Sequence, residues 1–373
     1  MSKIAIDARI LNSTTGRYVE RLLEWLQKMD DKNQYVVILS DKDRGAWTPK
    51  NPNFSIRYVP YKNYSLGEQL GFARFLYGLK ADLVHFCMPQ QPLLYFGKKV
   101  TTVHDLTLLK FYNSDKNWLV YHVKQLVGKL VFFTVARTSA KIITDANYTK
   151  RQYAKFARVS PAKIETIYLG SELKSAATPL AVPSLQNKDF IMYVGQQSDY
   201  KNIRRLIRAH QQLLTAYPRL HLALVGKLSG LNGAALRRNK KWCEKQGYKN
   251  VIFTDFVSDG QLVWLYQNAR AYAFPSLMEG FGLPGLEAME CGAPVVSSNA
   301  SCLPEVYGPA ALYFNPLSVN DMAKAIARVL QDEKLRQKLI GLGKRQAKKY
   351  SWQKTARQTL AVYMRAVQDS TKQ

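Results

Sequence analysis

Residues 274–289 decide the fold, and they read Phe-Pro-Ser-Leu-Met-Glu-Gly-Phe-Gly-Leu-Pro-Gly-Leu-Glu-Ala-Met. The segment 271–274 is short, apolar and aromatic enough for a buried strand, and Pro275 stops it because proline cannot continue a central ladder. A loop then begins near Ser276, and Pro284 suits the first turn of a helix. The stretch therefore predicts a strand, a glycine-rich loop and a helix, as in a parallel α/β sheet.

This loop has the composition of a cradle for a diphosphate. Its glycines leave backbone amides uncovered, and the helix start adds roughly half a unit of positive dipole charge. Glu279 and Glu287 would be repelled by phosphate, so we expect them to accept hydrogen bonds from hydroxyls, one on a sugar and one on a ribose. The alternative is an ordinary turn that needs glycine for packing and carries two solvated glutamates. The cradle would consist of Gly280, Phe281, Gly282 and Leu283.

The rest of the chain repeats this alternation of short apolar runs with longer periodic segments. Ligands of such sheets lie beyond the carboxyl ends of the strands, so the loops that follow the strands are the candidate sites. The fold class predicted is α/β, with two doubly wound parallel sheets joined by a weakly periodic linker at 171–188. The first series of expected strands is 4–6, 35–39, 56–59, 83–86, 99–103 and 142–144, and the second is 190–194, 222–225, 251–253, 271–274 and 294–296.

The charge balance indicates an anionic partner. The chain has 54 Lys and Arg against 27 Asp and Glu, a formal net charge of +27. A nucleotide sugar needs only a few of these charges, so the excess favours an anionic membrane surface, a lipid diphosphate or nucleic acid. A merely solvated basic surface would have the same composition. The four cysteines show neither close pairing nor metal spacing, which indicates reduced thiols in a cytoplasmic protein.

No segment is predicted to cross a membrane. The N-terminus lacks a charged region followed by an apolar stretch, so we expect no signal peptide. The most apolar segment, 118–136, contains Lys124 and Lys129, each of which would cost about 2.5–3.5 kcal/mol at a bilayer centre. This segment is therefore predicted to be a buried or interfacial helix.

Residues 279–288 resemble the motif of retaining glycosyltransferase family 4, mannosyltransferase-like members included, in which two glutamates are separated by seven residues. The similarity continues through 257–259, 266–271, 291–296 and 303–306. The resemblance implies the GT-B fold, in which two Rossmann-like domains face a cleft. It implies an acceptor-side domain at 1–175, a nucleotide-sugar-binding domain at 176–350, and a C-terminal helix within 351–373 that crosses back to the first domain.

The same resemblance implies roles for residues in three other loops. A neutral His104, after the strand at 99–103, would contact the donor sugar without adding charge, and Lys201 would neutralise the leaving diphosphate. Gln196 stands where the family has a second basic residue, so charge stabilisation would rest on Lys201 alone or also use Arg204 or Arg205. The remaining donor-binding candidates are Gly16, the one glycine left of a glycine-rich loop, with Gly195 and Asn202.

The function implied is retaining transfer of a hexose, with mannose from GDP-mannose as the preferred donor, to a hydroxyl of a glycan or lipid-linked acceptor. A UDP-sugar donor carrying GlcNAc or glucose is the main alternative. A phosphorylase or inverting transferase of the same fold, and a basic nucleic-acid-binding protein, are the others. No Asp-x-Asp lies where a metal would be needed, so neither metal nor cofactor is expected. The protein is predicted to be cytoplasmic and peripheral at the inner membrane face.

Overall fold

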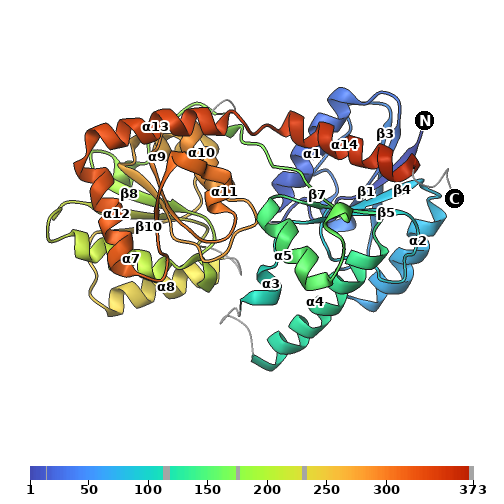
Figure 1. Ribbon diagram of the computed structural model, residues 1–373, viewed down its shortest axis with the longest axis horizontal. Helices are drawn as coiled ribbons and strands as arrows, with labels where there is room; N and C mark the ends of the chain where they lie inside the picture. Colours follow the sequence, from blue (N-terminus) through green and yellow to red (C-terminus); the bar gives the residue numbers. More distant parts are fainter. Residues whose placement is uncertain (14, 112–117, 174–176, 229–232, 369–373) are drawn as a thin grey trace. The chain divides into compact units, whose positions relative to one another are not determined.

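The computed structural model describes residues 1–13, 15–111, 118–173, 177–228 and 233–368 (Figure 1). These residues form two compact units. The first comprises Met1–Leu109, His122–Gly170 and Trp352–Gln373, and the second Lys110–Tyr121 and Ser171–Ser351. Each unit has its own sheet, covered by helices on both faces, and every strand pair is parallel. The predicted fold class of two doubly wound Rossmann-like sheets is thus confirmed.

The first sheet has seven strands in the order β3-β2-β1-β4-β5-β6-β7. Its direction of winding reverses between β1 and β4, where Ile4 lies opposite Tyr35 on one side and Leu83 on the other. In a parallel sheet this reversal opens a site beyond the carboxyl ends of the strands. The strands are β1 (Lys3–Asp7), β2 (Gln34–Ser40), β3 (Phe54–Val59), β4 (Leu83–Phe86), β5 (Lys99–Val103), β6 (Lys141–Thr144) and β7 (Ile164–Thr166).

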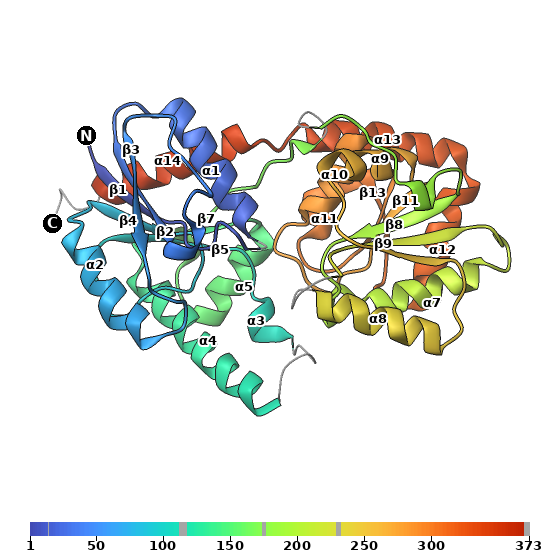
Figure 2. The ribbon, with the colours of Figure 1, turned by 180° about the vertical axis from the view of Figure 1, so that it is seen from behind.

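Helices α1 (Gly16–Met29) and α14 (Trp352–Gln368) pack side by side on one face of this sheet (Figures 1 and 2). The other face carries α2 (Ala73–Gly78), α4 (Trp118–Thr138) and α5 (Asn147–Ala157). A π-helical turn, η2 (Glu68–Phe72), runs directly into α2. The C-terminal helix therefore completes the first unit, although about 180 residues of the second unit precede it in the chain.

The second sheet has six strands in the order β10-β9-β8-β11-β12-β13, and its winding reverses between β8 and β11. Helices α7 (Ile203–Leu213), α8 (Ala234–Lys245) and α12 (Val319–Gln331) cover one face, and α9 (Asp259–Asn268), α10 (Leu283–Cys291) and α13 (Glu333–Ala347) the other (Figure 1). The strands are β8 (Phe190–Val194), β9 (His221–Val225), β10 (Val251–Thr254), β11 (Ala271–Phe274), β12 (Val295–Ser298) and β13 (Ala311–Phe314).

Two features differ from the sequence prediction. The short strands β7 and β13 were not expected, because three or four residues give too little periodicity to recognise. The segment predicted as a linker, 171–188, is partly anchored to the second unit where it is described: Leu173, Val182 and Leu185 are buried, and the Leu180 amide donates to the Gly260 carbonyl at 3.0 Å. Among the described residues, no helix is both long and apolar enough to cross a membrane.

Candidate active site

The two strongest catalytic candidates of the second unit meet at the carboxyl edge of its sheet. Lys201 follows β8 and Glu279 follows β11, and these neighbouring parallel strands deliver their loops to the same edge. The Lys201 ammonium donates to both carboxylate oxygens of Glu279, at 2.7 and 2.9 Å. The two side chains are only 16% and 11% exposed. The structure therefore brings together a cation and a carboxylate that are 78 residues apart in sequence.

The environment keeps Lys201 charged. Burial by itself would lower the pKa of Lys201, but the charge of Glu279 and the nearby Tyr200 and Tyr193 outweigh burial and raise it above its ordinary value. The ammonium also lies 5.0 Å from the centre of the Tyr200 ring. A permanent cation at this edge is suited to a phosphate group, and the partially buried setting strengthens that attraction.

The glycine-rich loop is held rigidly before α10 begins at Leu283. Gly282 has a φ of +92°, and a Cβ there would lie 2.5 Å from the Tyr307 hydroxyl. That hydroxyl donates to the Gly282 carbonyl at 2.6 Å. On the other side, the Glu279 amide donates to Ser301 Oγ at 3.1 Å. The predicted loop and helix start are thus present, and their geometry is fixed by α11 (Leu303–Tyr307) and the residues before it.

Two of the predicted donor-binding residues are largely enclosed by protein. Glu287, on α10, is buried, with the Tyr266 hydroxyl 3.5 Å from its Oε2. The Asn202 amide donates to the carbonyls of Pro275 and Pro316, at 3.0 and 2.7 Å. The structure thus gives Asn202 a definite function in holding three loops together. Direct contact of either residue with a donor stays a prediction.

Neither Arg204 nor Arg205 supplies a second cation to the loop that follows β8. Gly195 adopts a φ of +134°, and the exposed Gln196 accepts from the Tyr193 hydroxyl through its backbone carbonyl. Arg204 bonds Asn239 at 3.2 Å and lies over the Trp242 ring, and Arg205 donates to Asn202 Oδ1 at 2.9 Å. Both arginines serve contacts within the unit, so Lys201 is the basic candidate that the geometry favours.

In the first unit, the loops after β4, β5 and β6 meet at His104. Its Nδ1 lies 2.7 Å from Asp145 Oδ2, and its Nε2 lies 3.0 Å from the Cys87 carbonyl oxygen. A carbonyl only accepts, so Nε2 carries a proton. Burial would lower the pKa of His104, but the charge of Asp145 and the two hydrogen bonds raise it overall. The pKa of His104 is therefore shifted towards the protonated form, and its contact with the donor sugar as a neutral ring stays a prediction.

Asp145 was not singled out from the sequence, although an acidic residue directly after the apolar strand 142–144 is a signal for this edge. Gly16 has an internal reason to be glycine, because a Cβ there would lie 1.7 Å from the Leu11 carbonyl oxygen. Its predicted contribution to ligand approach therefore stays a prediction. The described residues contain no cluster of three or more His, Cys, Asp or Glu side chains arranged to hold a metal ion.

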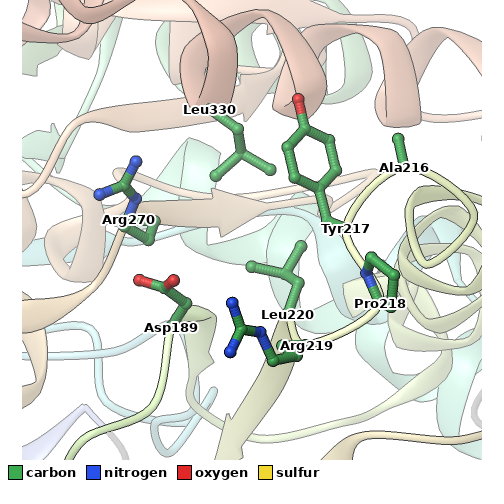
Figure 3. A pocket seen from close by; sticks show the side chains of 8 residues that line it. All are labelled: Asp189, Ala216, Tyr217, Pro218, Arg219, Leu220, Arg270 and Leu330. Atoms are coloured by element: carbon green, nitrogen blue, oxygen red, sulfur yellow. The ribbon is translucent and has the colours of Figure 1, made fainter.

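A separate pocket in the second unit lies away from all these candidates. Asp189, Leu220 and Arg270 line it, and each directly precedes a strand of the sheet (Figure 3). It therefore opens at the amino edge, opposite the carboxyl ends of the strands where Lys201 and Glu279 lie. Ligands of doubly wound sheets bind at the carboxyl edge, so this pocket is not the candidate active site.

Comparison with known proteins gives the architecture a family. A family model described as glycosyl transferases group 1 matches residues 181–346. O-antigen chain mannosyltransferase B of Escherichia coli is 32% identical over 280 residues, covering 71% of this chain and 70% of that protein. The serotype-specific mannosyltransferase WbdA of the same organism is 30% identical over 289 residues, but the match spans 73% of this chain and only 34% of that longer protein.

Among solved structures, sucrose-phosphate synthase from Thermosynechococcus elongatus superposes with a TM-score of 0.77 at 20% identity, covering 98% of this chain and 99% of that one. At this identity the likeness shows the fold alone, and it is the same pair of Rossmann-like domains. The resemblance first drawn from residues 279–288 is confirmed by the sequence relatives. Because its similarity to a mannosyltransferase spans most of both chains, this chain belongs to the glycosyl transferases group 1 family and is a hexosyltransferase.

Proposed function

We propose that this hexosyltransferase moves mannose from GDP-mannose to a hydroxyl of a glycan or lipid-linked acceptor, with retention of configuration. The observation that carries the proposal is the 32% identity to O-antigen chain mannosyltransferase B over 280 residues. The first relatives are both mannosyltransferases, and a growing polysaccharide chain is the kind of acceptor that the printed name of the first implies.

We place the donor in the second unit, where Lys201 and Glu279 lie. The bond between the anomeric carbon and the diphosphate oxygen breaks, and a bond to the acceptor oxygen forms on the same face of the sugar. The acceptor's proton passes to the departing diphosphate oxygen. Lys201 supports this step by neutralising the diphosphate, while Glu279 accepts hydrogen bonds from sugar hydroxyls. In the structure these two groups neutralise each other, so donor binding would compete with their contact.

His104 is proposed to act on the donor sugar from the first unit. With Nδ1 beside Asp145 and Nε2 beside the Cys87 carbonyl, the ring of His104 is fixed in place rather than free to act as a mobile base. Because both ring nitrogens are already engaged, His104 would act on the donor through the charge that its raised pKa favours and not by removing a proton. No metal ion or cofactor enters this scheme.

Membrane attachment at the cytoplasmic face is the second element of the proposal. On α4, Leu126 is 71% and Leu130 59% exposed, and Lys124 and Lys129 on the same helix are exposed as well. Apolar side chains flanked by lysines favour the interface of an anionic bilayer. Flotation with phosphatidylglycerol vesicles should retain the protein, and Leu126→Glu combined with Leu130→Glu should release it. Wild-type protein that stays unbound would refute this element.

The donor is tested by a thermal-shift screen of GDP, UDP, GDP-mannose, UDP-GlcNAc and UDP-glucose. A nucleotide at a hundredfold excess over its Kd stabilises the protein by about 2.7 kcal/mol. We expect the guanine series alone to raise the Tm. A uracil preference would keep the enzyme class and overturn the mannosyl assignment. No shift with any nucleotide would contradict the donor site, and salt-sensitive binding of an oligonucleotide would then favour the nucleic-acid alternative. The anomeric configuration of the product, read by NMR, tests retention.

A further inference from the structure

A pocket of about 290 Å³ opens in the first unit beside the loops that follow β4 and β5. Its polar lining residues include Thr15, Gln90, His104 and Asp105. Helix α4 contributes the apolar Val131 and Phe132. All of these residues belong to the first unit. The proposed reaction needs an acceptor as well as a donor.

Gln90 differs from the other polar lining residues because half of its amide is unused. Its side chain is buried, 4% exposed, and its Nε2 donates to Glu68 Oε2. A carboxylate engaged by Arg9 can only accept, so the nitrogen of the amide must face Glu68 and the oxygen must face away. That oxygen, Oε1, is buried and has no hydrogen-bond partner in the described structure. A buried acceptor without a donor costs roughly 1–3 kcal/mol, so a ligand donor would relieve a real penalty.

The amide is fixed by a network that the reaction itself does not use. Arg9 bonds Asp7 at 2.8 Å and Glu68 at 3.0 Å, and all three side chains are buried. Glu68 Oε2 also accepts from the Tyr64 amide at 2.8 Å. Glu68 lies in the π-helical turn η2, and such turns often occur at functional sites. The network holds Gln90 Oε1 in one orientation before any ligand arrives, which is the arrangement expected of a specificity residue.

We propose that this pocket binds the acceptor as a neutral sugar with an apolar group attached, and that Gln90 Oε1 accepts a hydrogen bond from one of its hydroxyls. Glu68 and Arg9 are positioning residues for that amide. Because Arg9 already bonds both Asp7 and Glu68, its charge is neutralised and does not favour a phosphate at this end of the pocket. The apolar wall on α4 accommodates the attached group. This inference rests on the proposed glycosyl transfer and names its acceptor class and its selecting residue.

The adjacent Gln91 provides a matched control. It is also a buried glutamine whose Oε1 has no partner in the described structure, but it is not part of the pocket lining. Its Nε2 donates to Thr101 Oγ1 at 3.3 Å. Any general effect of replacing a half-satisfied buried glutamine should therefore appear equally at both positions, whereas loss of an acceptor contact should appear only at Gln90.

The experiment compares Gln90→Met and Gln91→Met in the whole 373-residue chain, with octyl and methyl α-D-mannopyranoside as probes. Calorimetry gives the Kd of each probe, and transfer from GDP-mannose to octyl mannoside gives separate donor and acceptor KM values. We expect Gln90→Met to raise the acceptor KM and the probe Kd about tenfold, the loss of one hydrogen bond, with the donor KM unchanged. Gln91→Met should change neither, and octyl mannoside should bind wild type at least tenfold more tightly than methyl mannoside.

An acceptor KM within twofold of wild type for Gln90→Met, or an equal rise for Gln91→Met, would overturn the assignment of Gln90. Equal affinity for the two mannosides would overturn the apolar part. If Gln90→Met does not fold, Gln90→Asn keeps the amide but withdraws it by one methylene, and the same limits apply. If GDP-mannose does not bind wild type, the proposed donor fails, while the calorimetric Kd values still decide the pocket.

Discussion

Replacement of Lys201 and Glu279, singly and together, gives the sharpest test of the donor site. Their bidentate contact at 2.7 and 2.9 Å has a gross attraction of roughly 6 kcal/mol at an effective dielectric constant of about 20. Most of this is offset by the cost of removing both groups from water, and breaking such a pair from one side typically costs about 3–5 kcal/mol. Because both side chains keep some exposure, 16% and 11%, we expect Lys201→Met to lower the free energy of unfolding by about 3 kcal/mol.

An exposed pair on α1 calibrates that number. Lys28 contacts Glu24 at the same 2.7 Å, but the two side chains are 54% and 36% exposed. Lys28→Met should therefore cost no more than about 0.5 kcal/mol. Urea unfolding of both variants, followed by circular dichroism, measures the difference. Equal losses for Lys201→Met and Lys28→Met would show that burial of the Lys201 pair contributes nothing.

Replacing Lys201 and replacing Glu279 should change the affinity for GDP in opposite directions. Lys201→Met removes the cation and should weaken GDP binding about a hundredfold, or about 2.7 kcal/mol. Glu279→Gln releases Lys201 from its carboxylate, so GDP, which lacks the sugar, should bind several-fold more tightly. In wild type the sugar should make GDP-mannose bind more tightly than GDP, and Glu279→Gln should remove that difference in affinity. Calorimetric titration of the folded variants measures both, and a Glu279→Gln protein that loses GDP as strongly as Lys201→Met would refute this reasoning.

Three further changes are predicted. Asp145→Asn should remove the interaction that raises the pKa of His104. A raised folded-state pKa gives stability that is full below pH ~6.5 and is lost as the pH rises through that pKa, so from pH 6 upward the Tm of the variant should fall less than that of wild type. Parallel Tm curves would contradict the ion pair. Gly282→Ala should lower the free energy of unfolding by more than about 2 kcal/mol, because it adds a clash with Tyr307 to backbone strain. Gly247 has a φ of +67° and no atom within 4 Å of a new Cβ, so Gly247→Ala should lower it by about 1 kcal/mol. Equal losses of unfolding free energy in urea would exclude the clash. Tyr363→Phe removes the hydroxyl that lies 2.6 Å from Nδ1 of the fully buried His85, whose pKa burial lowers to about 3. The free energy of unfolding should fall by about 1–3 kcal/mol, with kcat retained. An unchanged Tm would show that this hydrogen bond does not hold α14 to the sheet.

Much of the fold could be predicted from local patterns. Apolar runs bounded by turn residues predicted eleven strands within two or three residues of their observed bounds, and Pro284 predicted the start of α10. The strands β7 and β13 escaped, because so few residues carry no period. The glycines of the loop before α10 were recognised, but the Tyr307 contact that makes Gly282 necessary was not, since the tyrosine lies 25 residues further along the chain.

The candidate site was predicted residue by residue but not as a set of contacts. The sequence singled out Lys201, Glu279 and His104 because each follows an apolar strand or lies in a familiar motif. It could not predict that Lys201 pairs with Glu279, that Asp145 raises the pKa of His104, or that Gln90 has an unpaired oxygen. These relations depend on strand order, which places the ends of β8 and β11, and of β4, β5 and β6, side by side.

The sequence by itself determined the elements, the parallel α/β class and the chemistry of the individual loops, because backbone period and turn geometry depend on neighbouring residues. Only the tertiary structure decided which of those groups meet. Arg9 and Glu68 are 59 residues apart and His104 and Asp145 are 41 apart, and no local rule specifies such pairs. They form because the packing of apolar faces favours one order of strands. That order places particular charged groups together at a partly buried edge of the sheet, where they have to pair with one another.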